Sequence, residues 1–129
     1  MILLLGFEDY REPGRRLADE LGADYREVEV HRFPDGEHRI TLPIGLPASL
    51  PEHVVVCRSL FEPNAKLIDL FLLSATAREL GAGRLTLVAP YLCYMRQDKA
   101  FHPGEAVSQR IIGRLLAEHF DALITVSPG

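Results

Sequence analysis

The sequence has little of several things that mark large protein classes. It has no tryptophan and only two cysteines in 129 residues. Cys57 and Cys93 stand in apolar surroundings without metal-ligand spacing, which predicts reduced, packed thiols in a cytoplasmic protein. No apolar run approaches the roughly 20 residues of a membrane-spanning helix, and residues 1–5 lack the basic start of a signal peptide. A net charge of −4 argues against a nucleic-acid partner.

Common nucleotide and metal motifs are missing as well. There is no Gly-x-x-x-x-Gly-Lys-Ser/Thr loop, so a nucleotide would not be held by a P-loop. Gly81-Ala82-Gly83 follows a predicted helix, which is the wrong context for a dinucleotide fingerprint. The five histidines show no metal-ligand spacing. The sequence therefore predicts no metal site in this chain.

What the chain does contain is an alternation of short apolar runs and helical patterns. Strands are predicted at residues 1–5, 53–57, 84–89 and 122–126, with helices after the first three. This order predicts an α/β fold, a parallel sheet with helices on both faces. In the second helix, one set of apolar residues recurs at helical spacing and predicts the buried face: Leu67, Ile68, Phe71, Leu72 and Ala75. The third helix is expected from about Glu105.

Residues 27–42 have a different pattern, in which polar and apolar residues alternate on both sides of Pro34-Asp35-Gly36. Proline fixes φ, aspartate caps locally and glycine supplies a positive φ, so we predict a β-hairpin that protrudes from the main sheet. Phe33 and Glu37 flank its turn. Two interpretations are open: ordinary turn chemistry with Phe33 folded back, or a flat ring for a base beside carboxylates that accept hydrogen bonds from an exocyclic amine.

A long loop follows the strand at 84–89, because Pro90 cannot continue the sheet hydrogen bonds. Ligands bind at the carboxyl ends of strands in such sheets. The loop offers Arg96 for a phosphate and Gln97 for a hydrogen-bonded group. A solvated loop with an ion pair between Arg96 and Asp98 explains the same residues, so this stretch does not decide the function by itself.

Together, the hairpin tip and the Pro-Tyr-x-x-Tyr-x-Arg-Gln-Asp loop resemble the ribose-phosphate pyrophosphokinases, or phosphoribosyl pyrophosphate synthetases. Three further features fall in the family's order and spacing: Asn64 before a Leu-rich helix, Ala82-Gly83-Arg84, and Thr125-Val126. The resemblance covers residues 1–129 but only the first half of the family's length. It implies the amino-terminal, ATP-side domain of a phosphoribosyltransferase-like (type I) fold, without the carboxyl-terminal domain.

The resemblance also implies an activity. Family enzymes transfer the β,γ-diphosphoryl group of ATP to the C1 hydroxyl of ribose 5-phosphate, with Mg²⁺, and release AMP for nucleotide biosynthesis. Phe33 would stack on adenine, and its edge would be recognised by Asp35, Gly36 and Glu37. Arg96 and Gln97 would contact the nucleotide and its phosphates. Neighbouring subunits would share each ATP, which implies a homo-oligomer, a dimer or a hexamer.

This sequence departs from the family where the metal is concerned. The family's Asp-x-His after the last strand, whose His binds Mg²⁺, is replaced by Ser127 and Gly129. The ribose 5-phosphate site lies in the absent domain. We therefore expect no catalytic or metal-binding residue in this chain and no turnover by it alone. Alternatives are a non-catalytic subunit that regulates true synthetases, and a free nucleotide-sensing module.

Overall fold

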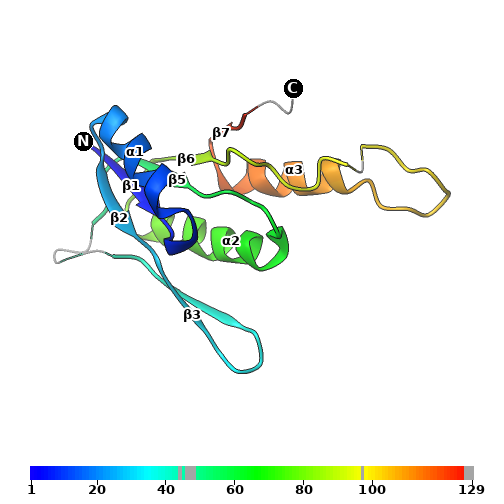
Figure 1. Cartoon of the computed structure of the whole chain (residues 1–129), viewed down its shortest axis with the longest axis horizontal. Helices are drawn as coiled ribbons and strands as arrows, with labels where there is room; N and C mark the ends of the chain where they lie inside the picture. Colours follow the sequence, from blue (N-terminus) through cyan, green and yellow to red (C-terminus); the bar gives the residue numbers. More distant parts are fainter. Residues whose placement is uncertain (44, 46–48, 97, 127–129) are drawn as a thin grey trace.

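The computed structural model describes residues 1–43, 45, 49–96 and 98–126 (Figure 1). A five-stranded parallel sheet has the order β2-β1-β5-β6-β7. Its strands are β1 (Ile2–Gly6), β2 (Asp24–Glu27), β5 (His53–Cys57), β6 (Arg84–Val88) and β7 (Ala122–Ile124). The helices are η1 (Glu8–Tyr10), α1 (Arg11–Leu21), α2 (Pro63–Glu79) and α3 (Ser108–His119). A separate hairpin consists of β3 (Glu29–Arg32) and β4 (His38–Thr41).

Helices cover both faces of the sheet, as the alternation along β1 shows. Leu3 and Leu5 belong to the main core, together with buried residues of α2 and α3. Leu4 points to the other face, where Ala18 of α1 and Cys57 pack against it. Side chains that alternate along a strand require apolar partners on both faces. The predicted α/β architecture is confirmed.

The strand β2 was not predicted. Its sequence, Asp-Tyr-Arg-Glu, is polar because β2 is an edge strand, so it lacks the apolar run that marks β1 and β5. It pairs with β1, and the Tyr25 ring occupies the space where a Cβ on Gly6 would stand, 2.6 Å from that position. The predicted hairpin therefore begins at Glu29 rather than Glu27.

The buried face of α2 was predicted only in part. Leu67 is buried and Phe71 half-buried, but Ile68 and Leu72 are 55% and 43% exposed, and Ala75 is exposed as well. The face against the sheet is formed instead by Leu67, Leu70, Leu73 and Ala77, with the polar Asp69 and Ser74 also buried. The helix is apolar nearly all round, so spacing alone could not select its inner face.

The last helix begins at Ser108, three residues later than Glu105. The Glu105 carboxylate accepts hydrogen bonds from the backbone N–H groups of Phe101 and His102, which closes a turn where the helix was expected to start. Among the described residues, no helix is long and apolar enough to cross a membrane.

Candidate functional site

The tip of the hairpin, residues 33–37, is a tightly closed turn. The N–H of Phe33 donates to the carbonyl of Glu37 at 2.8 Å, and the N–H of Gly36 donates to the carbonyl of Phe33 at 2.9 Å. Gly36 has φ = 95°, a conformation that side chains disfavour. Asp35 Oδ1 accepts the Glu37 N–H at 2.9 Å, and this bond lowers the pKa of the Asp35 carboxyl. The tip thus carries an ionised acceptor in a fixed position.

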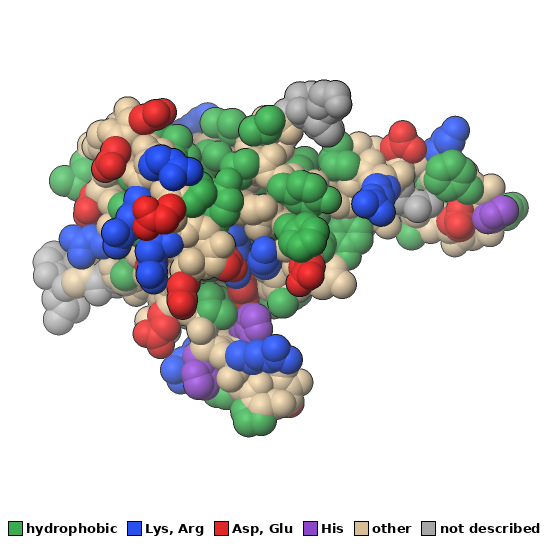
Figure 2. All heavy atoms as spheres, in the orientation of Figure 1, with side chains coloured by type: hydrophobic (Ala, Val, Ile, Leu, Met, Phe, Trp, Pro, Cys, Tyr) green, Lys and Arg blue, Asp and Glu red, His purple; other side chains and the backbone are tan. Residues whose placement is uncertain are grey.

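Phe33 is held at the surface rather than folded into the core. It is 37% exposed, with the edge of the His31 ring at 4.8 Å between centroids. The Arg39 guanidinium lies 5.8 Å from the centre of its ring. Figure 2 shows histidines, basic groups and hydrophobic side chains gathered on the projecting hairpin. An exposed ring in a fixed orientation can stack on a flat, apolar group.

The loop between β6 and α3 lines a cavity of about 490 Å³ with the start of α2. Arg96 is exposed at this cavity, and Gln97 lies outside the described residues. Tyr94 has φ = 58° and donates a hydrogen bond to Asn64 Oδ1. A positive φ at a non-glycine residue is unusual and accumulates at binding sites. Sequence reasoning gave Tyr94 no role of its own.

The hairpin tip and the loop do not meet within one chain. Figure 1 shows the hairpin projecting below the sheet near β2 and α2, whereas the loop extends along the long axis of the molecule, past the start of α3.

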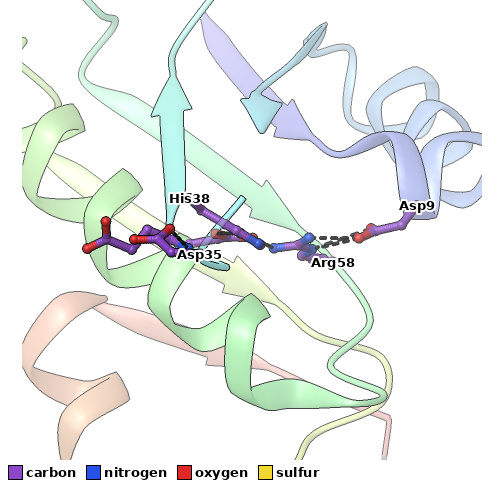
Figure 3. Close-up of polar contacts among 6 residues, drawn as sticks. Asp9, Asp35, His38 and Arg58 are labelled. Carbon is purple, nitrogen blue, oxygen red and sulfur yellow. Dashed lines mark hydrogen bonds and ion pairs between the residues drawn. The ribbon is translucent and has the colours of Figure 1, made fainter. Parts of the chain in front are cut away.

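A group of charged side chains at the carboxyl edge of the sheet was missed from the sequence. Arg58, which follows β5, is 5% exposed and donates to Asp9 at 2.7 Å and to Asp69 at 2.9 Å. Its guanidinium lies 3.9 Å from the centre of the Phe7 ring. The other Asp69 oxygen lies 2.7 Å from Nδ1 of His38, on the hairpin (Figure 3). One signal was available: Asp69 stands between Ile68 and Leu70 in an apolar helix.

Next to Arg58 a cavity of about 620 Å³ opens between the sheet edge and β3. One wall carries Glu27, which accepts hydrogen bonds from Arg11 and from the Tyr25 hydroxyl. The hydrogen bond from Arg11 lowers the pKa of the Glu27 carboxyl. The pKa of the Tyr25 hydroxyl is raised, mainly by burial and to a lesser extent by its hydrogen bond to Glu27. Among the described residues, no group of three or more His, Cys, Asp or Glu could hold a metal ion.

Comparison with known proteins decides the family. A family model described as the N-terminal domain of ribose phosphate pyrophosphokinase matches residues 2–119, a span that includes both the hairpin tip and the loop. The chain belongs to this family. The resemblance seen in the sequence is thereby confirmed.

Curated relatives of this pyrophosphokinase domain carry the same name. A ribose-phosphate pyrophosphokinase of Methanopyrus kandleri is 43% identical over 114 residues, which are 88% of this chain and 38% of the relative. One from Halobacterium salinarum is 35% identical over 126 residues, 98% of this chain and 43% of the relative. The domain spans about two fifths of the length of these relatives.

The fold of the pyrophosphokinase domain also matches a solved structure. A phosphoribosylpyrophosphate synthetase from Mycobacterium smegmatis superposes with a TM-score of 0.77 at 19% identity. The match covers 97% of this chain and 48% of that one. The phosphoribosyltransferase-like α/β fold is therefore confirmed.

Proposed function

We propose that this domain is the ATP-binding half of a cytoplasmic ribose-phosphate pyrophosphokinase. The parent enzyme transfers the β,γ-diphosphoryl group of ATP to the C1 hydroxyl of ribose 5-phosphate, giving phosphoribosyl pyrophosphate and AMP. The observation that carries this proposal is the hairpin tip, where an exposed Phe33 ring stands beside the ionised Asp35 in a domain of this family.

The tip has the chemistry to select adenine. Phe33 stacks on the base, and Asp35, Gly36 and Glu37 lie along its edge. An ionised carboxylate only accepts hydrogen bonds, so it pairs with the exocyclic amine of adenine. Guanine presents a carbonyl oxygen at the same position, which is an acceptor facing an acceptor. Two acceptors that face each other disfavour guanine more strongly than a difference in the shape of the two bases would.

The loop provides the phosphate contacts. The Arg96 guanidinium offers several N–H donors in a planar fork that suits phosphate oxygens, and Gln97 adds a further hydrogen bond. Diphosphoryl transfer depends mainly on positioning and on neutralising charge. A cationic side chain on a loop beside a cavity fits that requirement.

A complete ATP site needs two copies of the chain. The hairpin and the loop between β6 and α3 extend from different parts of the chain and in different directions (Figure 1), which supports a site that is shared between two copies. We infer that the tip of one subunit and the loop of its neighbour hold each ATP. The working enzyme is then a homo-oligomer, a dimer or a hexamer.

Mg²⁺ and ribose 5-phosphate are not assigned to residues of this domain. The described residues contain no ligand set that fits a divalent cation. The metal neutralises the ATP phosphates in such reactions. We place the ribose 5-phosphate site in the remainder of the parent protein and expect no turnover by residues 1–129 alone.

The proposal is tested by nucleotide binding to the purified chain, measured by calorimetry. ATP is expected to bind more tightly than GTP. Base–aromatic stacking is worth roughly 1–3 kcal/mol, so Phe33→Ala should weaken ATP binding by about tenfold or more. Arg96→Ala should weaken it to a similar degree. Phe101→Ala is a matched control, because the Phe101 ring is also exposed but lies beside Lys99 rather than at the hairpin tip. Equal affinity for ATP and GTP, or unchanged affinity in Phe33→Ala, would refute the adenine site.

Two further measurements test the half-enzyme assignment. Release of AMP from MgATP and ribose 5-phosphate by the chain alone would contradict it. The intact mass of the protein from its source cell should be well above 14.4 kDa, roughly twice that value. A mass that equals this chain's would instead favour the regulatory-subunit interpretation.

A further inference from the structure

The hairpin has few backbone contacts that could set its direction. Among the described strands, β3 and β4 pair with each other and with no strand of the five-stranded sheet, and at the base of the hairpin the Val28 N–H donates to the Gly6 carbonyl at 2.8 Å. Two-stranded ribbons are marginally stable on their own in water. The base of the hairpin is held by apolar packing, with Val28 and Leu42 buried and Val30 and Ile40 half-buried against the core. Apolar packing is non-directional, so a directional contact is needed to fix an orientation.

His38 provides such a contact at the end of β4 nearest the tip. Its Nδ1 lies 2.7 Å from Asp69 Oδ1, and its side chain is 16% exposed. In the tautomer that carries its proton on Nδ1, the His38 ring donates a hydrogen bond to the Asp69 carboxylate. This His38–Asp69 contact connects β4 to α2 through two residues that are 31 positions apart in the chain.

Asp69 is itself fixed from the other side. It is 0% exposed, and its second oxygen accepts a hydrogen bond from Arg58 at 2.9 Å. Arg58 is held in turn by Asp9 and by the Phe7 ring. Figure 3 shows the resulting line of side chains, from Asp9 through Arg58 to His38. A buried ion pair is weak evidence for added stability, because its desolvation cost is large, but its geometry is specific.

The turn at the hairpin tip begins directly after the His38–Arg32 pair. His38 pairs with Arg32 in the hairpin register, and the next residues on each strand, Phe33 and Glu37, close the turn by a backbone hydrogen bond. A change in the His38 position is therefore transmitted to the Phe33 ring and to Asp35.

We propose that His38 and Asp69 are positioning residues, which fix the direction of the hairpin tip and thereby the affinity of the domain for adenine nucleotides. The link to affinity rests on the proposed function. The link to tip direction does not, and it is measured separately. If loss of the contact leaves the competent orientation populated one tenth of the time, the apparent affinity falls by about tenfold.

The test compares three histidine substitutions. His38→Leu removes the donor but keeps an apolar side chain of similar reach. His38→Asn places its amide N–H close to where Nδ1 stands, so it should restore the bond. His53→Leu makes the same chemical change at an exposed residue at the start of β5, the end of the strand opposite to Arg58, and is the control. Asp69 is left intact, because its replacement would strand the buried Arg58.

Tip direction is read by paramagnetic relaxation from a spin label on Ile68→Cys, which lies on the exposed side of α2. The native Cys57 and Cys93 are both buried, so the label is selective. His38→Leu is expected to change the relaxation of the amides of residues 33–37, while His38→Asn and His53→Leu match the parent. Unfolding in urea is measured in parallel, to show that each variant is folded.

ATP affinity is measured on the same variants. His38→Leu should bind ATP about tenfold more weakly, and His38→Asn should recover most of the loss. Unchanged tip relaxation in His38→Leu would overturn the proposal, as would altered relaxation with unchanged ATP affinity. A parent chain that binds no ATP refutes the proposed function instead, and the relaxation data then decide the positioning role alone.

Discussion

Replacing Leu73 with alanine is expected to destabilise the protein far more than the same change at Leu72, its neighbour in α2. Leu73 is 0% exposed in the main core, whereas Leu72 is 43% exposed. Both changes are Leu→Ala in the middle of one helix, so the difference in helix propensity cancels. The comparison therefore isolates burial.

The magnitudes follow from these exposures. Leu→Ala at a fully buried site costs about 3–5 kcal/mol, because a cavity is added to the lost transfer free energy. Leu72 is only partly buried, so the groups removed there lose less burial and leave no enclosed cavity, and the cost is about 1–2 kcal/mol. The expected difference of about 2–3 kcal/mol corresponds to a difference in melting temperature of roughly 10 °C for a domain of this size.

Urea unfolding followed by far-ultraviolet circular dichroism measures both variants, since the chain has no tryptophan to serve as a fluorescence probe. Equal costs at Leu72 and Leu73 at every protein concentration would refute the orientation of α2 described here. A cost at Leu72 that grows with protein concentration would show that a second copy covers this face of the helix.

Three further outcomes are expected. Gly36→Ala should destabilise the hairpin by about 1–2 kcal/mol, because Gly36 has φ = 95° and a Cβ is strained in that conformation. Amide hydrogen exchange at residues 33–37 should become faster, and unchanged exchange would contradict the turn conformation at Gly36. The hydrogen bond from the Leu85 N–H, and to a lesser extent the one from Arg78, lower the pKa of the Asp121 carboxyl. The contribution of Asp121 to the free energy of unfolding is therefore complete above about pH 4 and is lost as the pH falls through its folded-state pKa. Asp121→Asn should therefore flatten the loss of stability in acid, and a pH profile identical to the parent's would argue against these contacts. Burial raises the pKa of the Cys57 thiol to about 11, so alkylation at pH 8 should be slow in the folded protein and fast in urea; rapid labelling of the native state would contradict that burial.

The hairpin could be predicted from the sequence because its determinants are local. Proline, aspartate and glycine specify the turn at residues 34–36 without help from the rest of the chain. The structure bears out the positive φ of Gly36 and the capping bond from Asp35. The edge strand β2 could not be predicted in the same way. Its four polar residues form a strand only because β1 offers an unpaired edge beside them.

The family motifs at the tip and the loop were equally visible in the sequence, but their arrangement was not. Spacing along the chain says nothing about the angle at which a hairpin leaves a sheet. The network of Asp9, Arg58, Asp69 and His38 illustrates this, since its members come from three different elements and from the residue after β5. None of them forms a motif with its sequence neighbours.

The sequence by itself determined the α/β class, the order of the apolar strands and the helices, the turn at the hairpin tip and the family. Each of these depends on periodicity or on residue types that act over a few positions. Tertiary structure alone decided which face of α2 is buried, that β2 extends the sheet, and that His38 meets Asp69 beside Arg58. Those outcomes depend on long-range packing and on the cost of burying charge without a partner, and both are defined only when distant segments come together.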